Sequence, residues 1–317
     1  MKIVRGLARA RGLFQRPLVT IGNFDGVHRG HQVIIQQARE DAAQRGSLAI
    51  AVTFDPHPIA VLRPDAAPRL LMTLGDRLAA LSAAGLDATV VQRFSKEFAD
   101  IEAADFVKRF IVDCLDTEKI VVGHDINFGR NRAGSTGLLI EEGGRYGFDV
   151  EVIRPVVVEG TVVHSSSVRE AVGSGEVALA ARLLGRPHFV RGRCVTGDAR
   201  GRELGFPTVN LKARTQLAPS EGVYATVATV AGRTLHAVTS IGSKPTFGGG
   251  GVVIEAHLFD FDEDIYGANV VLEFVERLRD QRKFDGPDSL IAQVRKDIEE
   301  SKRILSELAP QSGGPTN

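Results

Sequence analysis

The feature that most constrains the fold is the pattern of apolar runs between Pro17 and about Gly185. The pattern predicts strands at residues 18–21 and 48–54, with an amphipathic helix at residues 32–45 between them. The strand segments lack a polar residue at every second position, and this suits parallel strands that are covered on both faces. Repeated strand–helix units therefore predict an α/β fold for residues 1–185, a Rossmann-like, doubly wound parallel sheet.

The pattern changes after residue 187, where short β-rich runs are separated by turns that contain Gly and Pro. These runs predict a C-terminal antiparallel β-barrel domain over residues 186–308, and Ala231-Gly232 is typical of a hairpin turn. Asp288 is expected to cap a terminal helix, and the apolar stripe that follows predicts that this helix runs to about residue 308. Residues 309–317, rich in Gly and Pro, are predicted to be a disordered tail.

Composition excludes several classes of protein. The 39 Lys and Arg balance the 39 Asp and Glu, whereas a protein that binds the nucleic-acid backbone needs a basic surplus. The two cysteines are too few for a disulfide framework and are expected to pack in the core. Residues 1–14 contain no apolar signal region, and no stretch approaches the ~20 apolar residues of a membrane span. We therefore expect a cytoplasmic protein without a membrane or nucleic-acid partner.

Residues 22–31, Gly-Asn-Phe-Asp-Gly-Val-His-Arg-Gly-His, lie between a predicted strand and a predicted helix. In an α/β sheet this is the carboxyl edge, where ligands bind, and a helix N-terminus there attracts phosphate. His28 and His31 are three residues apart on the first helical turn and can point the same way. Two imidazoles in this place are suited to stabilising the charge that develops during phosphoryl or nucleotidyl transfer.

Other interpretations of the two histidines are weaker. They could only cap the helix, as polar residues at a helix start often do. A zinc site lacks a third and a fourth ligand at useful spacing. The sequence contains neither a Walker A run nor a Gly-x-Gly-x-x-Gly run, which argues against a P-loop kinase or a dinucleotide oxidoreductase.

A second glycine-rich segment occupies residues 197–210 and leads into a predicted strand. Its backbone N–H groups can form a concave anion site, so phosphate contacts are expected near Gly197, Gly201 and Gly205. Thr208 and Asn210 alternate along the strand and face the same side, and their oxygens are hard ligands suited to Mg²⁺. The alternative is a hairpin loop with a polar edge.

The string at residues 22–31 resembles the His-x-Gly-His motif of the nucleotidyltransferase superfamily, and its full length is typical of the bacterial bifunctional riboflavin kinase/FAD synthetases. The resemblance implies that His28 and His31 stabilise the transition state at the α-phosphate of ATP. It also implies ATP or phosphate contacts from other residues of the string, namely Gly22, Asn23, Phe24 and Gly30.

Two later strings also match that family. Residues 53–58, Thr-Phe-Asp-Pro-His-Pro, resemble its flavin-side motif and imply flavin contacts from Phe54, Asp55, Pro56 and His57. Residues 122–129, Val-Gly-His-Asp-Ile-Asn-Phe-Gly, resemble its nucleotide-side motif, which implies ATP binding by Asp125, Arg130 and Arg132 and a flavin contact from Phe128. Aromatic faces can stack on flat rings, and guanidinium groups pair with phosphates. Core packing of the phenylalanines and a solvated loop for the arginines are the alternatives.

A Ser-rich string at residues 164–169, His-Ser-Ser-Ser-Val-Arg, resembles a further motif of the family and implies ATP contacts from Ser165 and Ser166. Four positions depart from the family pattern. Either His164 replaces the first serine or the string is one residue short, and Val162 stands where many members carry an arginine. Ile126 replaces a phenylalanine and Ser135 replaces an aspartate. These changes keep the His-x-Gly-His chemistry but leave open a weakened grip on ATP.

The C-terminal segment resembles the riboflavin kinase motif Gly-x-x-x-Gly-Arg-x-Leu-Gly-x-Pro-Thr-x-Asn, and its companion strings follow in the order of that family. The resemblance implies that Glu255 takes the proton from the riboflavin 5′-hydroxyl, a reasonable task for a carboxylate near a primary alcohol. It places Thr208 and Asn210 at Mg²⁺. Arg279, near Phe284, is expected at the flavin, with a packing role as the alternative.

Together the resemblances cover nearly the whole chain and imply two reactions. Riboflavin and ATP would give FMN in the C-terminal domain, and FMN and ATP would give FAD and pyrophosphate in the N-terminal domain, both with Mg²⁺. The competing hypotheses are a kinase with a weak N-terminal half and a flavin- or nucleotide-binding regulator without turnover. The expected partners are the small-molecule substrates, and a transient homo-oligomer is left open.

Overall fold

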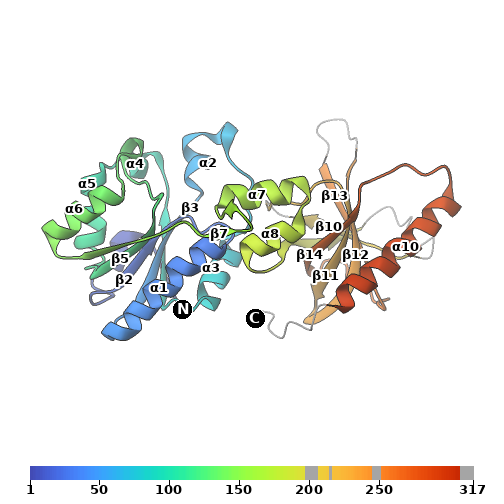
Figure 1. Cartoon of the computed structure of the whole chain (residues 1–317), viewed down its shortest axis with the longest axis horizontal. Coiled ribbons are helices and arrows are strands. Elements are labelled where there is room, and N and C mark those ends of the chain that lie inside the picture. The colour runs from blue at the N-terminus through green and yellow to red at the C-terminus, as the bar shows by residue number, and fades with distance from the viewer. Residues whose placement is uncertain (197–205, 214–215, 245–250, 308–317) are drawn as a thin grey trace. The chain divides into compact units, whose positions relative to one another are not determined.

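The chain packs as two units in a computed structural model that describes residues 1–196, 206–213, 216–244 and 251–307. The first unit is Met1–His164 and the second is Ser165–Asn317 (Figure 1). The division falls before the boundary predicted near Gly185, because the helices α7 (Ser165–Ser174) and α8 (Val177–Leu184) pack with the second unit. The predicted tail, residues 309–317, lies outside the described residues.

The first unit is built on a parallel sheet with the strand order β1-β4-β3-β2-β5-β6. Its central strands are almost completely buried, which explains why their sequences do not alternate between apolar and polar residues. The predicted doubly wound parallel sheet is confirmed. The strands are β1 (Lys2–Arg5), β2 (Leu18–Ile21), β3 (Ala49–Asp55), β4 (Ala88–Arg93), β5 (Lys119–Gly123) and β6 (Asp149–Ile153).

Short helices connect and cover these strands. Helix α1 (Arg29–Arg45) packs against β2, β3 and β5, and it ends at Gly46, whose left-handed backbone lets its N–H reach the carbonyls of the last turn. A small hairpin, β7 (Val157–Val158) and β8 (Thr161–Val162), is the last element of the unit in the sequence. The other helical segments are η1 (Leu7–Ala10), α2 (Pro58–Leu62), η2 (Pro64–Ala66), α3 (Leu74–Ala83), α4 (Lys96–Ala99), α5 (Ala103–Phe106), the π-helical η3 (Val107–Val112), η4 (Arg130–Arg132) and α6 (Thr136–Tyr146).

The strand order determines where a ligand site can form. The chain leaves β2 toward β3 on one side, and β5 lies on the other side of β2. This is the topological switch point of the sheet, where ligands bind in doubly wound folds. The string that begins at Gly22 follows β2, and the strings that begin at Thr53 and Val122 run through the carboxyl ends of β3 and β5. The fold therefore brings three segments that are far apart in sequence to one edge.

The second unit is a closed antiparallel barrel with the order β10-β13-β12-β11-β14-β9, as predicted. Tyr224 and Phe274 fill its interior, with ring centroids 5.5 Å apart. Ala231 and Gly232 both have positive φ between β11 and β12, as the predicted hairpin turn requires. The strands are β9 (His188–Val195), β10 (Val209–Ala213), β11 (Gly222–Val230), β12 (Arg233–Lys244), β13 (Gly251–Leu258) and β14 (Asn269–Arg279).

Helix α10 (Pro287–Ser306) covers the outside of the barrel against β11, β12 and β14. Leu305 is fully buried, and the Ser301 hydroxyl donates a hydrogen bond to the Ala237 carbonyl over 3.0 Å. The predicted terminal helix is thus present, and its apolar stripe fixes it to the barrel. The cap predicted at Asp288 is wrong, because the helix begins at Pro287 after Gly286 and Asp288 lies inside its first turn.

Candidate active sites in the two units

The turn between β2 and α1 has an unusual and well-anchored backbone. Phe24, Gly26 and Val27 have left-handed conformations, with φ of 50°, 88° and 42°. The buried carboxylate of Asp25 accepts hydrogen bonds from the backbone N–H groups of Leu71 and Met72, each over 3.1 Å. These bonds hold the turn in a fixed shape under the N-terminus of α1, which is the arrangement expected of an anion site.

His28 and His31 form a stacked pair at that helix N-terminus. Their ring centroids are 3.6 Å apart with an interplanar angle of 18°. His28 caps α1, because its Nδ1 accepts a hydrogen bond from the His31 N–H over 3.4 Å. A Cβ atom on Gly30 would lie 3.2 Å from the His28 ring and 3.3 Å from the Val163 carbonyl oxygen. Both distances are shorter than ordinary van der Waals contact, which favours a glycine between the two histidines.

His31 is electrostatically perturbed. Burial lowers the pKa of His31 well below 6.5, and the charges of His28, His164 and Arg77 lower it further. Its Nδ1 is buried and has no hydrogen-bond partner among the described residues. A buried ring nitrogen without a partner favours a role toward a ligand. A neutral imidazole can donate one hydrogen bond, and an arriving polyanion favours its protonated form.

Arg77 of α3 joins two of the predicted strings, and the sequence analysis missed it. Its Nη1 donates to the Asn23 carbonyl over 2.6 Å and its Nη2 to the Phe54 carbonyl over 3.1 Å. Burial lowers the pKa of Arg77, opposed by the nearby carboxylates of Asp25 and Asp55. The only signal in the sequence is a charged residue on the apolar face of a helix, beside Leu81.

The string after β3 lies next to the His-x-Gly-His turn. The Thr53 hydroxyl donates to the Asn23 carbonyl over 3.1 Å, so this carbonyl accepts from both Thr53 and Arg77. His57 caps α2, with its Nδ1 accepting from the Ile59 N–H over 3.3 Å. The Asp55 side chain is half exposed and Pro56 is exposed, so this string reaches the surface at the carboxyl edge of the sheet.

The two phenylalanines predicted at the flavin belong to one aromatic cluster. Phe54 contacts Phe98 with centroids 6.0 Å apart, Phe98 contacts Phe106 at 6.1 Å, and Phe106 contacts Phe128 at 5.5 Å. A Cβ atom on Gly134 would lie 2.6 Å from the Phe128 ring, so the ring rests directly on that glycine. Phe54 and Phe128 are both half-buried at the ends of this chain of contacts. Packing and ligand contact are therefore compatible at both positions.

The polar residues predicted at ATP come from several segments of the chain. Asp125 is exposed, and its Oδ2 lies 3.5 Å from Nδ1 of His164. Arg130 pairs with Glu102 and lies 3.8 Å from Asp100, so a phosphate would have to compete with two carboxylates. Arg132 is exposed. Ser165 and Ser166 begin α7 and belong to the second unit, whereas the histidine pair belongs to the first.

In the barrel, strand register brings the predicted base and a predicted metal ligand together. Asn210 on β10 is directly opposite Glu255 on β13, and Glu255 is directly opposite Ser240 on β12. All three residues are half-buried. Gln281 donates to the Ser240 hydroxyl over 2.7 Å and to the Ile241 carbonyl over 3.0 Å. No sequence motif marks Ser240 or Gln281, because the cross-strand neighbours of Glu255 depend on barrel register.

One further polar contact lies in this region. The Pro207 carbonyl is 2.8 Å from Nδ1 of His257, which attaches the segment carrying Thr208 to β13. Oxygen donors from a hydroxyl, an amide and a carboxylate are the ligand types that Mg²⁺ prefers, so the residues near Asn210 fit that ion chemically. Across the described part of the chain, no group of three or more His, Cys, Asp or Glu is arranged to hold a metal. Gly197, Gly201 and Gly205 lie outside the described residues.

Arg279 makes a strong structural contact. Its Nε and Nη2 donate to the Asp297 carboxylate over 3.0 and 2.7 Å, so β14 is joined to α10 by a bidentate ion pair. The guanidinium also lies 5.7 Å from the Phe284 ring centroid. This arrangement supports the packing alternative for Arg279, and contact with a flavin stays a prediction.

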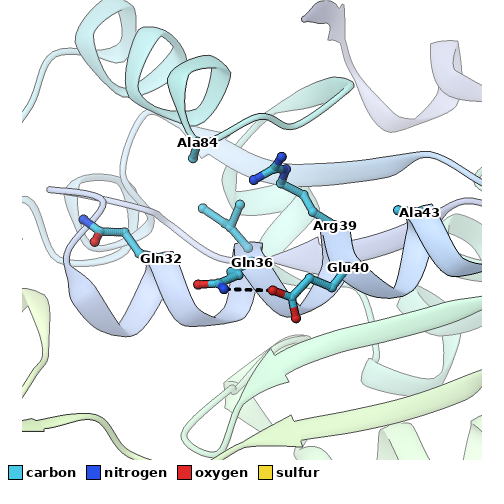
Figure 2. A pocket seen from close by; sticks show the side chains of 7 residues that line it. Gln32, Gln36, Arg39, Glu40, Ala43 and Ala84 are labelled. Carbon is cyan, nitrogen blue, oxygen red and sulfur yellow. Dashed lines mark hydrogen bonds between the residues drawn. The ribbon is translucent and has the colours of Figure 1, made fainter. Parts of the chain in front are cut away.

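A surface cavity of about 420 Å³ opens along α1 and is separate from both sites. Figure 2 shows its mixed polar and apolar lining, in which Gln36 donates to Glu40 over 2.8 Å. None of the predicted site residues lines it.

Comparisons with known proteins agree with this division of the chain. A family model described as FAD synthetase matches residues 13–167, and one described as riboflavin kinase matches residues 184–305. A Haemophilus influenzae protein named bifunctional riboflavin kinase/FMN adenylyltransferase is 35% identical over 96% of this chain and 100% of its own length. A Bacillus subtilis protein of the same name is 35% identical over 92% of this chain and 94% of its own.

A solved structure shows the same fold. The crystal structure of a Streptococcus pneumoniae protein described as a macrolide-efflux protein is similar, with a TM-score of 0.88 and 30% identity over 95% of this chain and 99% of that one. None of the helices in the described residues combines the length and the apolar character needed to cross a bilayer. Sequence identity over nearly full length and two matching family models place this chain in the family of bifunctional riboflavin kinase/FMN adenylyltransferases.

Proposed function

We propose that the chain makes FAD from riboflavin in two ATP-dependent steps, with one step in each unit. The observation that carries this proposal is the stacked pair of His28 and His31 at the N-terminus of α1, at the switch point of a parallel sheet. Family membership supplies the two reactions, phosphorylation of riboflavin to FMN and adenylylation of FMN to FAD. The residue roles below are our proposal.

In the barrel, Glu255 acts as the general base. It accepts the proton of the riboflavin 5′-hydroxyl while that oxygen attacks the γ-phosphorus of ATP and ADP leaves. Asn210 is directly opposite Glu255, and with Thr208 it would hold Mg²⁺ together with the ATP phosphates. The ion, when bound, neutralises phosphate charge. Ser240 and Gln281 fix the polar surroundings of the base, because they form a hydrogen bond on the adjacent strand.

In the first unit, a phosphate oxygen of FMN attacks the α-phosphorus of ATP, the bond to the β-phosphate oxygen breaks, and pyrophosphate leaves. His28 and His31 donate hydrogen bonds to the α-phosphate as charge builds up on it. The N-terminus of α1 adds its partial positive charge at the same place. Phe54 and Phe128, both half-buried, offer aromatic rings for the flavin side.

We also infer that both steps need Mg²⁺ and that the chain works in the cytoplasm on small molecules only. Chelation with EDTA should stop FMN and FAD formation, and added Mg²⁺ should restore both. Retained turnover in EDTA would refute the metal assignment.

Variants separate the two sites. Glu255→Gln should lower FMN formation from riboflavin by about 10²–10⁴-fold and leave FAD formation from supplied FMN unchanged. His28→Asn with His31→Asn should do the reverse. The matched control is His236→Asn, which changes an exposed histidine on β12 and should affect neither reaction. FAD formation that survives in the double variant would show that adenylylation does not use this histidine pair.

A further inference from the structure

His164 lies beside the His-x-Gly-His turn, at a position where the family string has a serine. It follows β8, and the Val163 N–H donates to the Val156 carbonyl over 2.9 Å. The Val163 carbonyl oxygen lies 3.3 Å from the position that a Cβ atom on Gly30 would take. The chain therefore contacts the turn one residue before His164, and this brings a third histidine next to the stacked pair.

The His164 side chain is connected to the rest of the site. Its Nδ1 lies 3.5 Å from Oδ2 of Asp125, the residue predicted at ATP. Its ring centroid is 6.2 Å from that of His124, and its charge is one of the causes that lower the pKa of His31. The side chain is 38% exposed, so a bound nucleotide can reach it.

Two observations indicate that this cluster faces a ligand. His31 carries a buried Nδ1 without a hydrogen-bond partner among the described residues, and a bound substrate can supply that partner. A metal does not explain the cluster, because no set of His, Cys, Asp or Glu in the described ranges has the arrangement of a metal site. Polyphosphate oxygens are the remaining ligand chemistry at a helix N-terminus lined with imidazoles.

We propose that His164 is a third phosphate-contacting imidazole of the adenylyl-transfer site, which donates a hydrogen bond to the departing pyrophosphate while Asp125 orients its ring. This inference rests on the proposed FMN adenylyltransferase activity. When the bond from the α-phosphorus breaks, its electron pair goes to the β-phosphate oxygen, and a donor there stabilises the leaving group. His28 and His31 act at the α-phosphate, so a third ring beside them meets the next phosphates of the same nucleotide.

The substitution is chemically meaningful. A serine hydroxyl donates one neutral hydrogen bond from a short side chain, whereas an imidazole reaches further and can carry a positive charge. Charged donors bind phosphate oxygens more strongly than neutral ones. In this chain the departure from the family string therefore strengthens the contact with ATP instead of weakening it.

The test compares His164→Phe, which removes both ring nitrogens, with His164→Gln, whose amide nitrogen lies near the place of Nε2. Initial rates of FAD formation are measured with supplied FMN and ATP, and the reverse reaction of FAD with pyrophosphate gives KM for pyrophosphate. His164→Phe should lower FAD formation about 10- to 100-fold and raise that KM, and His164→Gln should recover part of the loss. His236→Phe on β12 is the matched control and should change neither value.

Riboflavin kinase activity of the same chain reports on folding. A normal pyrophosphate KM and a normal FAD rate in His164→Phe would overturn this inference alone. Equal loss of kinase and adenylyltransferase activity would also overturn it, because the ring would then be structural. A wild-type chain that forms no FAD from FMN would overturn the proposed function itself.

Discussion

Arg77 gives the sharpest test of how the adenylyl-transfer site is held together. The change is Arg77→Met, which keeps an apolar stem of similar length and removes the guanidinium. Two hydrogen bonds are lost, to the Asn23 carbonyl and to the Phe54 carbonyl. The Asn23 carbonyl keeps its hydrogen bond from Thr53, whereas the Phe54 carbonyl loses the bond that Arg77 donates to it.

The size of the effect follows from these contacts. A hydrogen bond from a charged group contributes about 1.5–3 kcal/mol to the free energy of unfolding. The loss of two such bonds is partly offset, because Met does not carry the desolvation cost of a buried charge. We expect a net loss of about 2–4 kcal/mol in the free energy of unfolding of the first unit, or roughly 5–15 °C in its midpoint. The turn that carries His28 and His31 would shift with the Asn23 carbonyl, so FAD formation should fall by about tenfold or more.

The assay is FAD formation from supplied FMN and ATP, with calorimetric unfolding of the same preparations. Riboflavin kinase activity should be retained, because Arg77 belongs to the first unit. Arg39→Met is the matched control, since Arg39 is an exposed arginine of α1 in the same unit, and it should change little. An Arg77→Met chain that keeps its FAD rate and its midpoint within about 1–2 °C would refute the argument that this guanidinium fixes the turn.

Three further predictions concern single contacts. Gly30→Ala would place a methyl group 3.2 Å from the His28 ring, so FAD formation should fall about tenfold while FMN formation continues; an unchanged FAD rate would mean that the stacked geometry is not needed. Asp297→Asn removes the charge that pairs with Arg279 and should destabilise the barrel unit by about 2–3 kcal/mol in calorimetry, and a shift below about 0.5 kcal/mol would contradict the pairing. Because the folded-state pKa of His31 lies below 6.5, the unfolded chain binds an extra proton below that pH, and stability should fall as the pH drops from 7.5 to 5.5. His31→Asn should remove about 1 kcal/mol of this loss, and an identical pH dependence in the variant would contradict the lowered pKa.

Much of the fold follows directly from the sequence. Strands such as β3 are buried on both faces, so their unbroken apolar runs indicate a parallel sheet. The Ala231-Gly232 turn needs two positive φ angles, and this pair of small residues signals it. The start of α1 was predicted late, at Gln32 instead of Arg29, because His28 caps the helix and its first turn carries no apolar periodicity.

The candidate site was less predictable. The sequence spacing of His28 and His31 predicted that they point the same way, and the structure stacks them, although His28 is the cap residue and only His31 lies within α1. Arg77 was missed because its partners are backbone carbonyls on two other segments, which no local pattern marks. Ser240 was missed for a similar reason, because its place beside Glu255 depends on the register of β12 with β13. The Arg279–Asp297 pair joins a strand to a helix and carries no sequence signal either.

The most direct test of the central claim is a time course of flavins, separated by chromatography, after the purified chain is mixed with riboflavin, ATP and Mg²⁺. We predict that FMN rises and then falls as FAD accumulates, that Glu255→Gln leaves riboflavin unconverted, and that the double variant at His28 and His31 stops at FMN. Wild-type FMN that accumulates without FAD would contradict adenylylation by the first unit, and the absence of any product would contradict both assignments.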